Sequence, residues 1–177
     1  MSGPDLRAVQ APLKERYRVD PKSALITLRA QGHLDDPEGV SCNVETGRRL
    51  VQAGLHPATG GDGSLVCSGD MLLQALVACA GVTLRAVATS TGIEVRDGTV
   101  LAEGDLDFRG TLGVDRDAPV GFVAIRLSFD LDTPANVEQM ATLQRLTERY
   151  CVVYQTLRAG TPIVTAFARR DSPHTQV

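Results

Sequence analysis

The chain has 177 residues, of which 43% are hydrophobic, and this is enough for one domain with a sizeable core. The net charge is −3 and the basic residues are scattered, so the composition favours neither nucleic-acid binding nor attachment to an anionic membrane surface. We see no secretory signal and no apolar run long enough to span a bilayer, and we therefore expect a cytoplasmic protein. In a reducing compartment, four cysteines are more often free, catalytic or metal-binding than disulfide-bonded.

The first half of the chain predicts a small sheet followed by a long helix. Residues 1–22 are polar and contain three prolines, which indicates an arm ahead of a single domain over 23–170 and a polar tail over 171–177. Within the domain, the pattern predicts strands over 24–30, 39–45 and 49–55, arranged as an antiparallel meander, and a loop over 56–64. A long helix then begins at Ser68 as its cap, carries Asp70 in its first turn and ends at Gly92. Because this helix is apolar over most of its circumference, we expect it to be buried centrally.

The second half predicts two strands, a helical region and a final strand. The strands span about 93–110 and 119–132, and the second alternates between apolar and polar residues. Thr133 and Pro134 predict the start of a helix, whose phase is irregular near Cys151 and which ends at Gly160. The last strand is predicted over 161–167. This order of elements indicates an α+β fold with antiparallel sheet.

The candidate chemistry rests on cysteines. Cys42, Cys67, Cys79 and Cys151 form no C-x-x-C pair and have no histidine at metal-ligand spacing, so we expect no metal site and no cofactor. Cys79 lies among small and apolar residues in the middle of the long helix, where an inert packing cysteine is common. Cys151 lies at an apparent helix break, where unpaired backbone N–H groups could lower its pKa, although an inert role is open for it too.

Several stretches occur in an order that is typical of one family. The glycine-rich GGDG at 60–63 precedes SGDMLLQALVACAGVTLRA at 68–86, the acidic AEGDLD lies at 102–107, and RYCVVYQTLRAGTPI spans 149–163. Together they resemble the OsmC/Ohr family of organic hydroperoxide reductases. The resemblance implies an intertwined homodimer in which antiparallel sheets enclose two central helices and both cysteines approach each other near the subunit interface.

The resemblance also implies roles for the two cysteines. Cys79 would be the peroxidatic thiol, whose thiolate attacks an organic hydroperoxide and becomes a sulfenic acid, and Cys151 would resolve it as a disulfide. A small or protein dithiol would then restore both thiols. A cytoplasmic thiol peroxidase that reduces organic hydroperoxides is therefore the leading hypothesis for function.

The family activates its thiolate with an arginine that is held by an acid. Asp70 is the acid that matches by position here, whereas the better-known peroxidases carry Glu one position earlier, at Gly69. Candidates for the arginine are Arg29, Arg48 and Arg49. The chain also has Val152 where many members have Pro.

Two alternatives are open. The absence of the usual Glu at Gly69 and of the usual Pro at Val152 favours a dimeric protein of the same fold that binds a hydrophobic small molecule without turnover. A structural or redox-sensing dimer is the other alternative, and no sequence feature supports it. Cys42 and Cys67 are expected to be ordinary residues.

Overall fold

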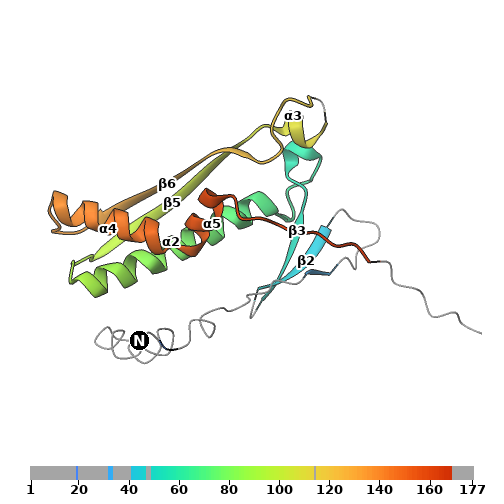
Figure 1. The fold of residues 1–177 in the computed structure, drawn as a ribbon. Coiled ribbons are helices and arrows are strands. Elements are labelled where there is room, and N and C mark those ends of the chain that lie inside the picture. Colours follow the sequence, from blue (N-terminus) through green and yellow to red (C-terminus); the bar gives the residue numbers. More distant parts are fainter. Residues whose placement is uncertain (1–18, 20–31, 34–40, 47–48, 114, 169–177) are drawn as a thin grey trace, which may run out of the picture.

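The computed structural model describes residues 19, 32–33, 41–46, 49–113 and 115–168. Two long strands run alongside a group of helices, and a smaller sheet stands at one end of them (Figure 1). The architecture is α+β, as the order of elements predicts. The strand predicted over 24–30, the tail over 171–177 and nearly all of the arm over 1–22 lie outside the described residues.

The smaller sheet brings the chain to the start of the long helix. Its strands follow the order β1 to β4 and span Gly32–His33, Ser41–Thr46, Arg49–Gly54 and Val66–Cys67. The antiparallel pairing of β2 with β3 confirms the predicted hairpin. The short pairing of β3 with β4 is parallel, because the loop that carries the 3-10 helix η2 (Pro57–Thr59) returns the chain along β3.

The long helix α2 spans Ser68–Thr91, close to its prediction. Gly92 ends it in the left-handed conformation, with φ +69°, as expected. The predicted cap is wrong by one residue: Cys67 occupies the N-cap in an extended conformation, without a side-chain hydrogen bond, and Ser68 is already helical.

The described elements of the chain cover one face of α2. This face packs against the strand β5 and the helices α4 and α5, and its buried residues are Leu76, Ala80, Leu84, Val87 and Ala88. On other sides Leu72 is 37% exposed and Val82 is 72% exposed. Within the described residues, the prediction of central burial is therefore wrong, because the described elements cover a single side of the helix.

Helix α2 is also long and apolar enough to cross a membrane, by length and composition alone. The expectation that the sequence holds no such run is wrong in this respect. Core helices of soluble proteins pass the same test, and α2 contributes most of the buried apolar residues of the described chain.

Strands β5 (Asp97–Leu106) and β6 (Phe122–Asp132) form an antiparallel ribbon, which lies along the helices in Figure 1. Both strands are shorter than predicted, because the connection contains a short helix, α3 (Phe108–Thr111). The predicted alternation along β6 is confirmed: Leu127 and Phe129 are partly buried, whereas Arg126 is exposed.

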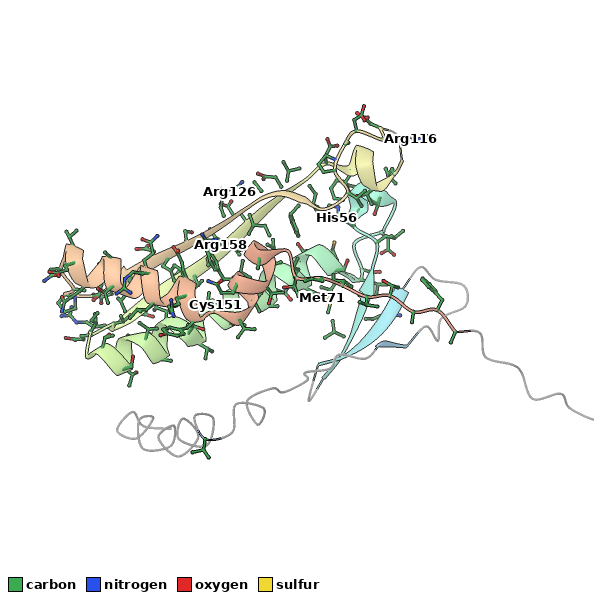
Figure 2. All side chains as sticks on the ribbon, viewed as in Figure 1. His56, Met71, Arg116, Arg126, Cys151 and Arg158 are labelled. Carbon is green, nitrogen blue, oxygen red and sulfur yellow. The ribbon has the colours of Figure 1, made fainter. Side chains whose placement is uncertain are left out.

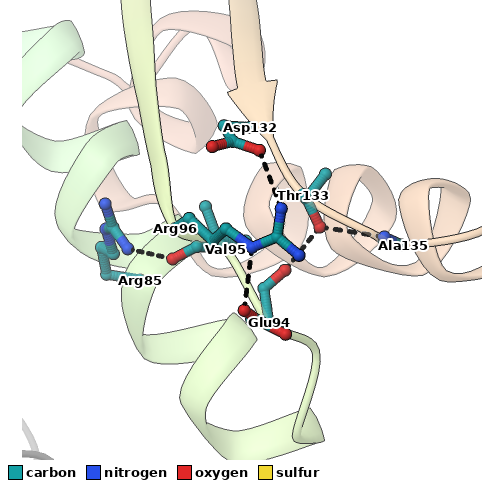
Figure 3. Close-up of polar contacts among 7 residues, drawn as sticks. All are labelled: Arg85, Glu94, Val95, Arg96, Asp132, Thr133 and Ala135. Carbon is teal, nitrogen blue, oxygen red and sulfur yellow. Dashed lines mark hydrogen bonds and ion pairs between the residues drawn. The ribbon is translucent and has the colours of Figure 1, made fainter.

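Helix α4 (Val137–Tyr150) begins three residues later than predicted. Asn136 accepts a hydrogen bond from the Gln139 N–H, and the Gln139 side chain accepts one from the Asn136 N–H, which completes a capping box. The prediction of Thr133 as the cap is wrong. Its hydroxyl instead donates to the Glu94 carbonyl and accepts from the Ala135 N–H (Figure 3).

Polar contacts of two arginines lie next to the Thr133 hydroxyl and connect α2, β6 and the segment before β5. Arg96 forms ion pairs with Glu94 at 3.0 Å and with Asp132 at 3.4 Å, while Arg85 of α2 donates to the Val95 carbonyl at 2.6 Å (Figure 3). They hold the base of the β5–β6 ribbon against α2 and α4. Val87, Ala88, Ile93 and Leu143 form the buried apolar cluster beside them.

A second short helix, α5, spans Val152–Ala159, and the predicted break near Cys151 is confirmed. Gly160 ends α5 as expected, with φ +61°. The strand predicted over 161–167 is wrong for the described chain, where this segment is neither helix nor strand. Ile163, Val164 and Phe167 are 89%, 95% and 97% exposed, because no strand of the described chain pairs with them.

Candidate thiol site

Cys151 lies at the junction of two helices (Figure 2). Its extended backbone, with φ −72° and ψ 110°, interrupts the helix. Cys151 is therefore both the C-cap of α4 and the N-cap of α5. Its N–H still donates to the Thr147 carbonyl at 2.9 Å, and its carbonyl accepts from the Gln155 N–H at 3.0 Å. The junction is therefore hydrogen-bonded on both sides of the cysteine.

A side chain reinforces this junction from within α5. The Gln155 Nε2 donates to the Glu148 carbonyl at 2.7 Å, across the interruption. That carbonyl belongs to the last turn of α4, where acceptors lack an intrahelical partner. Gln155 therefore fixes the angle between the two helices around Cys151.

The junction brings Cys151 to Cys79. Cys151 is 1% exposed, whereas Cys79 on α2 is partly exposed, and both are free thiols. The two side chains are hydrogen-bonded, with Cys151 as the donor when Cys79 is ionised. The structure thus brings together the two cysteines that the sequence singles out.

The surroundings of Cys79 favour its thiolate. Burial acts to raise the pKa of the thiol, but hydrogen bonds to the sulfur outweigh it, so that the Cys79 pKa is lowered. The donors are the backbone N–H of Val153, the Cys151 thiol and the backbone N–H of Val152. The Thr83 hydroxyl, which donates to the Cys79 carbonyl at 2.7 Å, also acts to lower this pKa. The two backbone donors belong to the first turn of α5, where N–H groups have no partner within the helix.

Cys151 behaves in the opposite way. Burial is the main cause that raises its pKa, and its hydrogen bond and charge interaction with Cys79 raise it further, against donation from the Tyr154 and Val153 N–H groups. The expectation that the helix break lowers the pKa of Cys151 is therefore wrong. The break does supply N–H donors, but those of Val152 and Val153 lower the pKa of Cys79, which is the less buried thiol.

Asp70 lies apart from the two thiols. It is exposed in the first turn of α2 and lines a separate cavity of about 630 Å³, together with Cys67 and His56. Asp70 and Cys79 are nine positions apart on the helix, which corresponds to about 13 Å along the axis and to opposite sides of the helix. The structure therefore does not bring Asp70 to the Cys79 sulfur.

The candidate arginines give no further contact. Arg29 and Arg48 lie outside the described residues, and Arg49 begins β3 without a described side chain. Cys42 lies in β2, and Cys67 is a partly buried free thiol at the start of α2. Within the described ranges, no three His, Cys, Asp or Glu side chains are grouped so as to hold a metal ion.

Sequence reasoning missed the donors around Cys79. The hydroxyl of Thr83 could have been found from its spacing, because residues four apart lie on the same side of a helix. The N–H groups of Val152 and Val153 could not, because their role depends on how α5 packs against α2. The molecule is therefore an α+β protein in which two free thiols, from α2 and from the α4–α5 junction, lie next to each other.

Comparison with known proteins assigns the chain to a family. The model of the OsmC family, described as OsmC-like protein, matches residues 61–166, well over half of the chain. The chain therefore belongs to the OsmC-like family. A comparison with curated proteins finds no match.

Solved structures share the fold at low sequence identity. An OsmC-like protein from Mycoplasma pneumoniae has a TM-score of 0.61 and 16% identity, covering 75% of this chain and 88% of its own. An organic hydroperoxide resistance protein from Elizabethkingia anophelis has a TM-score of 0.60 and 15% identity, over 76% and 89%. The organic hydroperoxide resistance protein OsmC from Legionella pneumophila gives 0.58 and 18%, over 76% and 90%. These likenesses establish the OsmC-like fold.

Proposed function

We propose that the protein is a thiol peroxidase that reduces organic hydroperoxides, with Cys79 as the attacking thiolate and Cys151 as the resolving thiol. The observation that carries this proposal is the pairing of two free thiols at the α4–α5 junction, where Cys151 is buried and the partly exposed Cys79 receives the N–H donors at the start of α5. An ordinary thiol with a pKa of about 8.5 is only a few per cent ionised at neutral pH. A lowered pKa supplies more nucleophile at Cys79, while Cys151 keeps its proton.

The reaction follows from these two states. The Cys79 thiolate attacks the distal oxygen of the hydroperoxide, the O–O bond breaks, and the alkoxide takes up a proton and leaves as the alcohol. Cys79 is then a sulfenic acid. Cys151, whose thiol is hydrogen-bonded to Cys79, attacks that sulfur with loss of its own proton, and water leaves as the disulfide forms. A dithiol reduces the disulfide by thiol exchange and is itself oxidised.

The residues next to Cys79 support an organic substrate. The sulfur accepts from the backbone N–H groups of Val152 and Val153 at the start of α5, and both of these residues are apolar. Such surroundings accommodate an alkyl group better than the small and polar hydrogen peroxide. Two of the structural relatives are named as organic hydroperoxide resistance proteins.

We further propose that the protein acts as a homodimer. Apolar side chains are exposed on α2 and over 161–167, among them Val82, Val164 and Phe167, and exposed apolar surface of this kind marks interaction sites. A groove of about 910 Å³ between β6 and the helices α4 and α5 is also lined mainly by apolar residues. A second copy of the chain would cover these surfaces.

Peroxide consumption with matched cysteine variants tests the enzymatic proposal. We expect the wild type to consume cumene hydroperoxide with dithiothreitol as reductant, and Cys79→Ser to consume it no faster than buffer. Cys67→Ser is the control. Cys67 is also a free thiol, but it lies at the N-cap of α2, twelve positions before Cys79, so this variant should retain the wild-type rate. Equal rates for wild type and Cys79→Ser would refute the proposal.

A further inference from the structure

Thr83 follows Cys79 by one helical turn on α2. Its hydroxyl donates to the Cys79 carbonyl, with 2.7 Å between Oγ1 and the oxygen. Both side chains are partly buried, and residues four apart project from the same side of a helix. The hydroxyl is therefore held beside the residue that carries the reactive sulfur.

Two other threonines show which part of this contact is ordinary. Thr89 donates to the Arg85 carbonyl at 2.9 Å, and Thr156 donates to the Val152 carbonyl at 2.8 Å. Both are exposed, and such bonds to the carbonyl four residues earlier are common in helices. Thr83 differs because the residue whose carbonyl it contacts also carries a thiol.

A hydroxyl has one proton and rotates to suit its acceptors. When Cys79 is a neutral thiol, its carbonyl is the stronger acceptor. When Cys79 is ionised, the sulfur carries a full negative charge, and hydrogen bonds to charged groups are the stronger ones. The Thr83 hydroxyl therefore has two possible acceptors on Cys79, the carbonyl and the sulfur. Ionisation of the thiol makes the sulfur the stronger of the two.

We propose that Thr83 is a further residue of the thiol site, whose hydroxyl turns from the Cys79 carbonyl to the Cys79 sulfur as the thiolate forms. The Thr83 hydroxyl is among the groups that lower the pKa of Cys79. It acts from α2 itself, whereas the Val152, Val153 and Cys151 donors reach the sulfur from the α4–α5 junction. Its importance for turnover rests on the peroxidase proposed above, but its effect on the thiolate does not.

Alkylation of the reduced protein tests this role without peroxide. The rate of iodoacetamide labelling at Cys79 would be measured by peptide mapping from pH 5 to pH 10 for wild type, Thr83→Val and Thr83→Ser. Valine keeps the branched shape without the hydroxyl, and serine keeps the hydroxyl. We expect Thr83→Val to move the midpoint to higher pH and to lower the rate below it by roughly three- to tenfold, since a donor to a charged group is lost.

The controls separate this role from a structural one. Thr89→Val removes the same kind of helix bond far from the thiol and should label like wild type, while Thr83→Ser should stay within about twofold of it. If Thr83→Val unfolds, as judged by circular dichroism, Thr83→Ala replaces it. An unchanged midpoint in the folded variant, or an equal change in Thr89→Val, would overturn the role of Thr83.

The peroxidase proposal fails separately. If Thr83→Val shifts the labelling midpoint while wild type leaves cumene hydroperoxide untouched, the Thr83 assignment holds and the proposed enzyme activity does not.

Discussion

The Cys151 thiol, 1% exposed, is hydrogen-bonded to the thiol of the partly exposed Cys79, and the two pKa values move in opposite directions. Burial dominates at Cys151, whereas at Cys79 burial is outweighed by hydrogen-bond donors, the largest of which is the Val153 N–H at the start of α5. Cys79 therefore ionises more readily than an ordinary thiol, and Cys151 ionises less readily.

The two thiols should respond to pH in sequence. A lowered pKa means that Cys79 loses its proton at a lower pH than an ordinary thiol, and a raised pKa means that Cys151 loses its proton at a higher one. As the pH rises from 5 to 10, alkylation of Cys79 should therefore increase first. Peptide mapping after short iodoacetamide pulses measures both midpoints, and a lower midpoint for Cys151 than for Cys79 would contradict the assignment of their roles.

The Val152 N–H can be removed with little change of backbone. Proline suits the first position of a helix, and Cys151 before it already has the extended backbone that a residue preceding proline requires. Val152→Pro should therefore fold but lack one donor to Cys79, so that the Cys79 pKa rises. The labelling midpoint is the measurement, and Val152→Ala, which keeps the N–H, should match wild type. Identical midpoints for the proline and alanine variants would show that this N–H does not act on the sulfur.

Gln155 should stabilise the junction of α4 and α5. Gln155→Met keeps the length of the side chain but cannot donate to the Glu148 carbonyl, and it should lower the free energy of unfolding by about 1 kcal/mol. Urea denaturation measures this loss. Gln144→Met is the matched control, because Gln144 Nε2 donates to the Glu148 side chain at 2.9 Å in a solvent-exposed hydrogen bond, whose loss should cost less. Equal losses would argue against a special role for the junction contact.

The segment 161–167 should contribute to the dimer. Val164 is 95% exposed in the chain by itself, and a charge placed there would be buried against a second copy. Val164→Lys should therefore shift the protein toward the monomer in size-exclusion chromatography with light scattering. Val120→Lys, at a 65% exposed position in the β5–β6 connection, should leave the mass unchanged. A monomeric wild type would refute the dimer proposal itself.

The sequence predicts the frame of this molecule better than its details. Gly92 and Gly160 mark helix ends because their left-handed backbone is a local requirement, and the phase change near Cys151 marks the helix break. Thr133 and Asn136 are both good caps, and in the structure the Thr133 hydroxyl binds the Glu94 carbonyl while Asn136 completes the capping box of α4. Contacts between elements therefore settle what local patterns leave open.

The site shows the same division. The ordered motifs single out Cys79 and Cys151, and the structure brings these two thiols together. The pKa of each depends on burial and on which sulfur receives the α5 donors, and neither can be inferred from spacing alone. Asp70 matches the family acid by position but lies on the far side of α2 from Cys79. The role of an arginine stays a prediction.

Disulfide mapping after one equivalent of cumene hydroperoxide tests the central claim most directly. The fully reduced protein would be mixed with the peroxide, blocked with an alkylating reagent and digested without reductant. The account predicts one new disulfide, between Cys79 and Cys151, with Cys42 and Cys67 still alkylated, and in Cys151→Ser a Cys79 sulfenic acid that dimedone traps. Four alkylated cysteines, or a disulfide that excludes Cys79, would contradict it.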